Sequence, residues 1–365
     1  MDIDLEQFKF RDKKKADEIL RELERADEEI TVMHVCGTHQ DTLVKHGLEP
    51  ILKDVGVDIR QGPGCPVCVT NQKEIEEIIK LAEEGITVTA FGDMINVPGL
   101  NSSLRDAKSW GAKVKIVYGV DDAVKYAEGH DEEVVFMSVG FETTTPSIAS
   151  AILNEPPGNF SILTCNRIIP PALKLILETG EIGLDGLIEP GHVSAIIGTE
   201  PYEPLSERFH IPQVVAGFEP LDLLLAALLL VRQRQEGRAE VENEYDRVVK
   251  AEGNLKAKNA MEKVFKTKDV EWRGFPTIRD SGLKLRNKFN IYDARRIFED
   301  ELEEIWEKEY EEPEGCLCGE VLRGVVDSEE CPKFAEECTP QNPIGPCMVS
   351  REGGCNIAFR YKRKK

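Results

Sequence analysis

The sequence has no long hydrophobic run and is short of basic residues, and both features exclude classes of protein. Its longest apolar stretch, Leu223–Val231, is far shorter than the roughly 20 residues that a membrane-spanning helix needs, and is typical of a buried helix. Lysine and arginine total 46 against 67 aspartate and glutamate residues, which gives a net charge of -21. Because so acidic a chain is repelled by phosphate backbones, we expect no nucleic-acid partner unless a local basic patch exists, and the short apolar run predicts no association with a membrane.

Two sequence signals are also missing. No secretory signal peptide is recognisable, because the segment Glu6–Arg25 is charged throughout. No phosphate-binding loop of the form G-x-x-x-x-G-K-[ST] occurs, which leaves a nucleotide hydrolase unsupported. We therefore expect a cytoplasmic protein. In that reducing compartment, ten cysteines indicate metal or redox chemistry rather than a framework of structural disulfides.

The chain of 365 residues is long enough for two or three domains. Strand-like segments such as Ile30–Val35 and Val134–Val139 alternate with helix-like segments, which predicts parallel α/β sheets. A glycine and a polar helix start follow both segments, so we expect two similar α/β domains, at residues 29–129 and 130–233. Residues 1–28 and 234–365 are expected to form a third domain, mixed helical and irregular, with a cysteine-rich tail.

A C-x-x-C motif, Cys65 to Cys68, lies inside a run of glycine and proline. An apolar segment, Val55–Ile59, precedes it, and a helix signal with Asn71 as the expected N-cap follows. Such a strand–loop–helix junction favours a thiolate, because backbone N–H groups and the helix dipole face the sulfur. The spacing suits either a reversible disulfide or two ligands of a metal site.

Three further candidates lie where predicted strands end, which is where parallel sheets gather functional residues. Cys36, like Cys65, follows a strand, so both thiols could open on one face of a sheet. His39 could act as a hydrogen-bond donor or acid, although a hydrogen bond at the helix start is the alternative, and a short helix is expected to begin near Asp41. Glu142 could direct its carboxylate between the domains and handle a proton; a surface carboxylate is the alternative.

Six cysteines form the tail group: Cys316, Cys318, Cys331, Cys338, Cys347 and Cys355. Their wide and irregular spacing in glycine- and proline-rich loops fits a cubane iron–sulfur cluster at least as well as a zinc site. Six thiols are two more than one cluster needs. Cys316 and Cys318 are too close in sequence to reach two corners of one cluster easily, so we expect one ligand and one thiol free for redox chemistry. The alternative is that the two extra cysteines are small buried hydrophobic residues, as we expect for the isolated Cys165.

These motifs together resemble the HypD family of nickel–iron hydrogenase maturation proteins along nearly the whole chain. The matching segments are Cys36-Gly37-Thr38-His39, Gly62-Pro63-Gly64-Cys65-Pro66-Val67-Cys68, Gly140-Phe141-Glu142-Thr143-Thr144, Pro190-Gly191-His192-Val193-Ser194, Ser281-Gly282-Leu283-Lys284-Leu285-Arg286, Cys316-Leu317-Cys318-Gly319, Cys338-Thr339-Pro340 and Cys347-Met348-Val349-Ser350. One departure is visible: many members have a second histidine two positions after His39, where this chain has Asp41, which we expect to cap the helix.

The resemblance implies a third domain that holds a 4Fe–4S cluster. It also implies a complex with the small chaperone HypC, which holds an iron that receives two cyanides and one carbon monoxide. Cyanide would come from a thiocyanate on HypE, with HypF acting upstream. By motif position, Cys36 would contact the iron, and Cys65 and Cys68 would form a redox-active dithiol nearby. The family pattern gives four cluster ligands and leaves Cys318 and Cys347 as a second thiol pair; the ligands are Cys316, Cys331, Cys338 and Cys355.

On this interpretation the protein is a redox-active assembly scaffold rather than a conventional turnover enzyme. Electrons would pass from the cluster to Cys318 and Cys347, then to Cys65 and Cys68, and then to the iron, because thiol–disulfide exchange moves two electrons per pair. Two other functions remain open. A thioredoxin-like disulfide oxidoreductase with a structural cluster would turn over ordinary disulfides without partners. A cluster-bearing regulatory protein would tolerate replacement of the C-x-x-C thiols.

Overall fold

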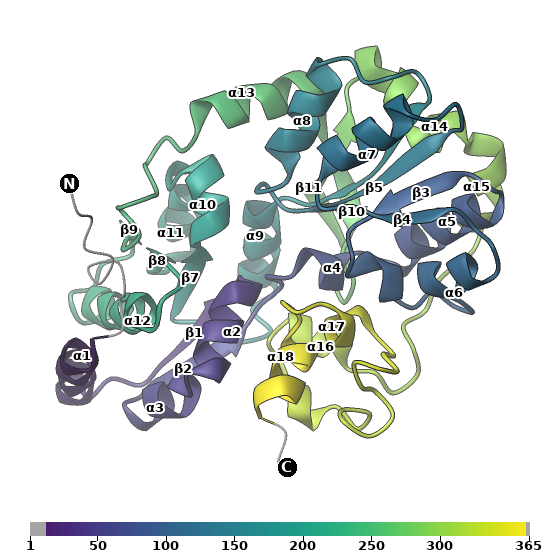
Figure 1. The fold of residues 1–365 in the computed structure, drawn as a ribbon. Coiled ribbons are helices and arrows are strands. Elements are labelled where there is room, and N and C mark those ends of the chain that lie inside the picture. The colour runs from purple at the N-terminus through teal and green to yellow at the C-terminus, as the bar shows by residue number, and fades with distance from the viewer. Residues whose placement is uncertain (1–11, 363–365) are drawn as a thin grey trace, which may run out of the picture.

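The computed structural model describes residues 12–362, so the ends of the predicted third domain, residues 1–11 and 363–365, lie outside the described part. Two parallel sheets form its frame (Figure 1). Sheet A has the order β2-β1-β7-β8-β9, with β1 (Ile30–His34), β2 (Val57–Gln61), β7 (Gly186–Pro190), β8 (Gln213–Ala216) and β9 (Val241–Asn243). Sheet B has the order β4-β3-β5-β6, with β3 (Thr87–Ala90), β4 (Val114–Ile116), β5 (Val134–Gly140) and β6 (Phe160–Asn166). The predicted α/β class with parallel sheets is confirmed.

Helices cover both sheets. In chain order to the end of sheet A they are α1 (Lys13–Ala26), α2 (Gly37–Lys45), α3 (Leu48–Asp54), α4 (Pro66–Val69), α5 (Gln72–Glu83), η2 (Met94–Asn96), α6 (Leu104–Ser109), α7 (Val120–Glu128), α8 (Thr145–Leu153), α9 (Ile169–Thr179), α10 (Gly191–Ile197), η3 (Glu200–Tyr202), α11 (Glu203–Phe209) and α12 (Pro220–Gln235). The remaining ones are α13 (Leu255–Val264), η4 (Asn287–Tyr292), α14 (Ala294–Ile297), α15 (Glu299–Trp306), α16 (Cys318–Leu322), η5 (Ser328–Glu330), α17 (Pro346–Val349) and α18 (Gly354–Tyr361).

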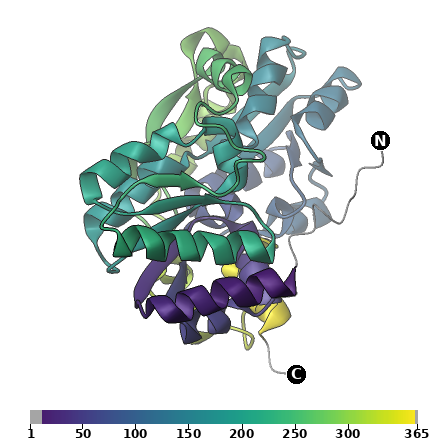
Figure 2. The ribbon, with the colours of Figure 1, turned by 90° about the vertical axis from the view of Figure 1, so that its left-hand side faces the viewer.

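The buried apolar residues form three clusters. Helices α1 and α12 pack side by side on the outer face of sheet A, where the apolar helix predicted from Leu223–Val231 is buried (Figure 2). Helices α7 and α8 pack on one face of sheet B. The largest cluster includes Met33 and Leu187 of sheet A together with Val135 and Leu163 of sheet B, so both sheets share one core between them. Burial of this surface holds the two sheets together.

The sheets group the strands differently from the predicted division at residues 129 and 130. Strands β3 and β4 precede that point, yet they pair with β5 and β6 in sheet B. Strands β1 and β2 pair instead with β7, β8 and β9, which come more than 120 residues later in the sequence. The chain thus leaves sheet A after β2 and returns at β7. Alternation of strands and helices predicts parallel pairing, but it does not identify the partner of each strand.

The region expected to be helical and irregular also contains an antiparallel hairpin, β10 (Phe265–Glu271) and β11 (Thr277–Leu285). Phe265 and Val270 are the buried residues of β10, Asp269 between them is exposed, and the pairing with β11 shifts register between Lys268 and Val270. Because charged residues lie on the exposed face of β10, the sequence pattern did not predict this strand. The hairpin packs on β6 and α9, so this part of the chain is joined to sheet B.

A buried ion pair fixes the end of β6. The Arg167 side chain is fully buried, with Nη2 2.5 Å from Oε2 and Nη1 3.2 Å from Oε1 of Glu74 on α5. We expect Glu74→Gln to lower the free energy of unfolding by about 3–5 kcal/mol, because it leaves a buried guanidinium without its counter-charge. Urea unfolding measures the change. The matched control is Glu304→Gln, which removes the exposed pair with Lys308 and should cost less than about 1 kcal/mol; equal costs would contradict the prediction.

Candidate functional site

The loops that follow β1 and β2 meet at the carboxyl end of sheet A. Cys36 is the N-cap of α2, and Cys65 is the N-cap of α4. A Cβ on Gly64 would lie 2.2 Å from the backbone nitrogen of Cys36, so only glycine permits this approach. The Gly37 N–H donates a hydrogen bond of 3.1 Å to the Gly64 carbonyl. The structure therefore brings Cys36 and the C-x-x-C loop into contact, at the carboxyl end of sheet A.

The expected start of the first site helix was wrong. Helix α2 begins at Gly37, directly after Cys36, and not near Asp41. Asp41 lies inside the helix, where its carboxylate accepts a hydrogen bond of 3.0 Å from Arg360 on α18. It therefore does not cap the helix but links α2 to the cysteine-rich tail. In contrast, the prediction that Asn71 caps α5 is confirmed, because its side chain accepts a hydrogen bond of 3.0 Å from the Glu74 N–H.

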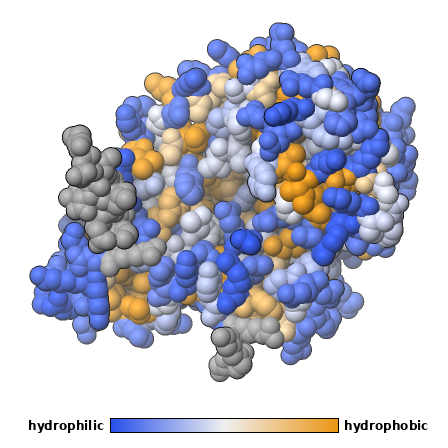
Figure 3. Space-filling model, viewed as in Figure 1, coloured by the Kyte–Doolittle hydropathy of each residue, from blue (hydrophilic) through white to orange (hydrophobic). Residues whose placement is uncertain are grey.

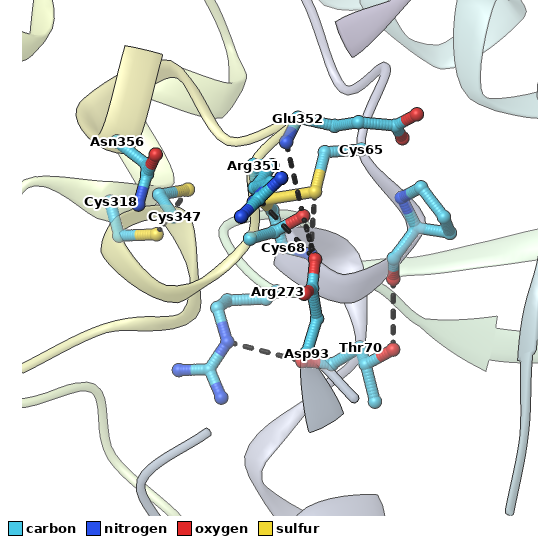
Figure 4. Close-up of a disulfide and its surroundings, with 12 residues drawn as sticks. Cys65, Cys68, Thr70, Asp93, Arg273, Cys318, Cys347, Arg351, Glu352 and Asn356 are labelled. Carbon is cyan, nitrogen blue, oxygen red and sulfur yellow. Dashed lines mark hydrogen bonds between the residues drawn. A yellow bond between two sulfur atoms is a disulfide. The ribbon is translucent and has the colours of Figure 1, made fainter. Parts of the chain in front are cut away.

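Cys65 and Cys68 form a disulfide at the two ends of the first turn of α4 (Figure 4). Both are buried, with 1% and 0% of their surface exposed. The Cys68 N–H donates a hydrogen bond of 3.2 Å to Cys65 Sγ. Helix α4 contacts β5 of sheet B as well as α17 of the tail. The disulfide thus lies where sheet A, sheet B and the tail come together.

The tail places a second pair of thiols next to this disulfide. Cys318 at the start of α16 and Cys347 on α17 are both buried, and their sulfurs are 2.9 Å apart. Because α17 packs on α4, the two cysteine pairs lie on facing segments, as Figure 4 shows. The sequence paired these thiols only through a family resemblance. The structure brings them together within reach of disulfide formation, after a small movement.

Sequence reasoning missed Arg273, which lies close to both pairs (Figure 4). It is 2% exposed, its backbone N–H donates to the Val69 carbonyl at 3.0 Å, and its Nε donates to the Thr70 carbonyl at 3.1 Å. Hydrogen bonds from Cys316 and Cys347, with the Arg273 charge as a smaller cause, hold the pKa of Cys318 well below its usual value. No local pattern marks such a residue, because its partners are about 200 positions away in the sequence.

Burial governs the protonation of Cys36 and His39. The pKa of Cys36 is raised to about 11, mainly by burial, so this residue is a thiol at neutral pH. Burial lowers the pKa of His39 to about 3, which keeps the imidazole neutral. His39 Nε2 is 3.3 Å from the Ala216 carbonyl oxygen, which can only accept, so Nε2 carries the hydrogen and Nδ1 the lone pair. Within residues 12–362 no donor reaches Nδ1, which leaves it free to accept a hydrogen bond or bind a metal.

A tail loop covers this site, and it too escaped the sequence reasoning. A Cβ on Gly37 would lie 2.5 Å from Glu352 Cβ, so the loop between α17 and α18 packs directly on the start of α2. The Glu352 charge adds to the raised pKa of Cys36. Ser350, two residues earlier, donates a hydrogen bond of 3.2 Å to Asp93 of the sheet B side. The tail loop therefore covers the region of Cys36 and contacts residues that follow strands of both sheets.

The four remaining tail cysteines surround one region of the loops. Three of them, Cys331, Cys338 and Cys355, are less than 10% exposed, and Cys316 is half-buried. Burial raises the pKa of Cys338, with Cys355 and Cys331 as smaller causes, and the hydrogen bond with Cys318 raises that of Cys316, with Cys331 as a smaller cause, so these thiols lie near one another. The Ile344 N–H donates to Cys338 Sγ at 3.4 Å, a contact of the kind that tunes iron–sulfur clusters.

The four thiols suit one kind of metal centre better than another. Among residues 12–362, no three His, Cys, Asp or Glu side chains converge closely enough for a single metal ion. A cubane cluster instead binds each thiolate to a different iron, so its ligands stand farther apart than the ligands of one ion. Four thiols in irregular loops, with an N–H directed at one sulfur, fit such a cluster.

Glu142 is buried where β5 ends, so the alternative of a surface carboxylate is wrong. Its side chain is 1% exposed, and Oε1 accepts a hydrogen bond of 3.1 Å from the Ile169 N–H. Within the described chain Oε2 has no hydrogen-bond partner, and burial raises the pKa of Glu142 to about 7. This carboxyl group can therefore exchange a proton near neutral pH. Glu189 at the end of β7, which the sequence reasoning did not single out, is likewise buried with its pKa raised to about 8.

The raised pKa of Glu142 predicts a pH-dependent stability. The folded state holds the proton more tightly than the unfolded chain, where the reference pKa is 4.5, so stability is lost as pH rises from 4.5 to about 7. Glutamine does not titrate and keeps an oxygen for the Ile169 N–H. We therefore expect Glu142→Gln to gain up to about 3 kcal/mol over the wild type at pH 8, and far less at pH 4.5. Urea unfolding at both pH values measures this, with exposed Glu311→Gln as control; a pH-independent difference would contradict it.

Cys165 lies apart from the site, as expected for a buried small side chain. It is 1% exposed, and burial raises its pKa far above the usual value. Its sulfur is 3.9 Å from Arg295, outside the contacts between the cysteine pairs. Cys165 is therefore a suitable control for substitutions of the other cysteines.

No helix within residues 12–362 is both long and apolar enough to cross a bilayer.

Comparisons with known proteins match the chain over most of its length. The family model described as "HypD: Hydrogenase formation hypA family" matches residues 12–362. A Methanocaldococcus jannaschii protein named for hydrogenase expression and formation is 45% identical over 356 residues, covering 96% of this chain and 97% of that protein. Hydrogenase maturation factor HypD2 of Bradyrhizobium diazoefficiens is 43% identical over 345 residues, covering 91% and 89%. Hydrogenase maturation factor HypD of Azotobacter vinelandii is 41% identical over 347 residues, covering 92% and 90%.

Proposed function

The chain belongs to the HypD family, and we propose that it is a redox-active scaffold for assembly of the hydrogenase iron centre. In this proposal the protein and HypC together hold an iron ion that receives two cyanides and one carbon monoxide. HypE supplies the cyanide, with HypF acting upstream of it. The iron is the substrate of this assembly.

The observation that supports the proposal best is that helix α17, which carries Cys347, packs on helix α4, which carries Cys68. The buried Cys65–Cys68 disulfide faces a thiol pair, Cys318 and Cys347, whose sulfurs are 2.9 Å apart. Exchange between the pairs breaks the S–S bond of the first and forms one in the second. Two electrons and two protons move to Cys65 and Cys68, so the step balances without another reactant. Cys36 lies beside the pair that is reduced, where the iron would be bound.

The other residues of the site have separate roles in the proposal: they bind the cluster, bind the iron, handle a proton and exclude water. Cys316, Cys331, Cys338 and Cys355 would hold a 4Fe–4S cluster, which, when bound, supplies electrons one at a time. Cys36 is a thiol at neutral pH, so ligation of iron displaces its proton. The buried carboxyl group of Glu142 can accept a proton nearby, and the neutral His39 offers its free Nδ1 as a hydrogen-bond acceptor. The tail loop at Glu352 keeps water from Cys36.

The burial of both disulfide sulfurs argues against the main alternative. A thioredoxin-like oxidoreductase must present its attacking sulfur to protein disulfides in solution, which requires access. Cys65 and Cys68 are 1% and 0% exposed, beneath helix α17. Exchange with an internal thiol pair needs no such access.

Anaerobic co-purification with HypC tests the proposal. We expect the complex to contain iron beyond the four atoms of a cluster, acid-labile sulfide, and infrared bands of cyanide and carbonyl ligands. A complex without such bands, from cells that supply HypE and HypF, would overturn the assembly role. Turnover of an ordinary disulfide substrate by the isolated protein would favour the oxidoreductase instead.

A further inference from the structure

A basic and aromatic surface on sheet B contrasts with the acidity of the whole chain. The segment Leu104–Tyr118, which spans α6 and β4, contains four basic residues and one acidic residue, in a chain of net charge -21. The acidic residue, Asp106, already accepts hydrogen bonds from Ser103 in a capping box. Arg105 and Lys108 are exposed and form no ion pair with the described residues. Because Lys113 of the segment is paired with Glu132, the positive charge available to a partner comes mainly from Arg105 and Lys108.

Large apolar side chains are exposed in the same segment. Trp110 is 68% exposed, Ile116 is 54% exposed and Tyr118 is 94% exposed. Leu100, just before α6, is 54% exposed. Figure 3 shows hydrophobic side chains gathered on this half of the visible face. Exposed tryptophan, tyrosine and arginine are the residues that dominate binding energy at protein interfaces, whereas nucleic-acid surfaces need more charge than this.

This surface continues into a groove that reaches the cysteine-rich tail. The groove has a volume of about 470 Å³, with Leu100 and Arg105 on one side and Gln341 to Pro343 on the other. Ile344, the next residue, donates its N–H to Cys338 Sγ at 3.4 Å. A partner in this groove would therefore lie next to the segment that precedes Ile344. The Ile344 N–H is hydrogen-bonded to the sulfur of Cys338, a cysteine that we assign to the cluster.

We propose that this surface, defined by Leu100, Arg105, Lys108, Trp110, Ile116 and Tyr118, docks a small acidic electron-transfer protein that delivers electrons to the tail. The inference rests on the proposed function, because it needs an electron acceptor in the tail. Electron-transfer complexes use small interfaces, and opposite charges steer their association. A positive patch with an aromatic centre on an acidic protein selects an acidic partner and orients it toward Cys338.

The test uses the full-length, cluster-loaded protein and a reduced bacterial ferredoxin, an acidic protein, as the probe. Anaerobic stopped-flow absorbance follows reduction of the cluster. We expect Arg105→Glu with Lys108→Glu to slow the second-order rate by ~10-fold or more at low salt, and the difference to vanish at high salt. Trp110→Ala should slow it at all salt concentrations. The matched control changes the exposed pair on α13, Leu255→Ala with Lys256→Glu, and should leave the rate unchanged.

Controls and contrary results separate docking from its alternatives. Dithionite should reduce the cluster of every variant at one rate, which shows that the substitutions act on docking alone. Equal ferredoxin rates in all variants would overturn the inference, as would binding of single-stranded DNA, but not ferredoxin, that depends on the same residues. If the protein forms no cluster, the proposed function fails by itself. Calorimetric titration with ferredoxin then still reports on the surface: weaker binding by the variants supports docking, and no binding overturns it.

Discussion

Cys36→Ala is expected to abolish retention of iron in the complex with HypC while leaving the fold intact. The Cys36 thiol lies at the carboxyl end of sheet A, and the residue is 7% exposed. The backbone of Cys36 packs closely against Gly64. Low-spin iron with cyanide and carbonyl ligands requires a soft, electron-rich donor, which alanine lacks. Loss of one buried sulfur costs the fold about 1–2 kcal/mol at most, far less than a domain of this size can lose.

Iron counting and infrared spectra of the purified complex measure this effect. We expect a loss of more than ~100-fold in iron beyond the cluster. The matched control is Cys165→Ala, which removes an equally buried sulfur outside the site and should retain the iron. Cys36→Ser separates ligation from packing, because it keeps the volume but replaces the soft donor. Iron retained by the alanine variant would refute the assignment of Cys36 as its ligand.

Local features of this site could be predicted from the sequence because they depend on short-range geometry. The strand before Cys36, the strand before Cys65 and the Asn71 cap each follow from a few consecutive residues. Helix α2 is an exception. Its start at Gly37 is set by the contact with Gly64, about 27 positions away, rather than by the local capping preference of Asp41.

The features that could not be predicted all depend on distant parts of the chain. The pairing of β1 with β7 joins segments more than 150 residues apart, and no strand pattern encodes a partner. Arg273 and Glu352 read as ordinary charged residues in irregular segments, and only tertiary packing places them at Cys318 and Cys36. The same holds for Glu142, whose raised pKa comes from burial between elements rather than from its neighbours in sequence. The chemistry of the site is therefore encoded mostly in contacts across the two sheets and the tail.

Replacement of Cys347 by alanine is expected to stop cyanide transfer to iron while the cluster and the iron ligand remain. Cys347 is the tail sulfur that lies 2.9 Å from Cys318 and belongs to the helix that packs on α4. Without it the tail cannot form a second disulfide, so exchange with Cys65 and Cys68 cannot proceed beyond a mixed disulfide. The Cys65–Cys68 bond then stays oxidised when the cluster is reduced.

Two measurements on one preparation distinguish this block from general damage. Alkylation and mass spectrometry should find Cys65 and Cys68 still linked in the Cys347→Ala protein after reduction of the cluster, but free in the wild type and in Cys165→Ala. Infrared bands of iron-bound cyanide should fall by more than ~100-fold in the same sample, because the transfer lacks its two electrons. Dithionite should still reduce the cluster, since Cys347 is not among its four assigned ligands. Full cyanide bands in this variant, or in Cys318→Ala, would show that electrons reach the iron by another route.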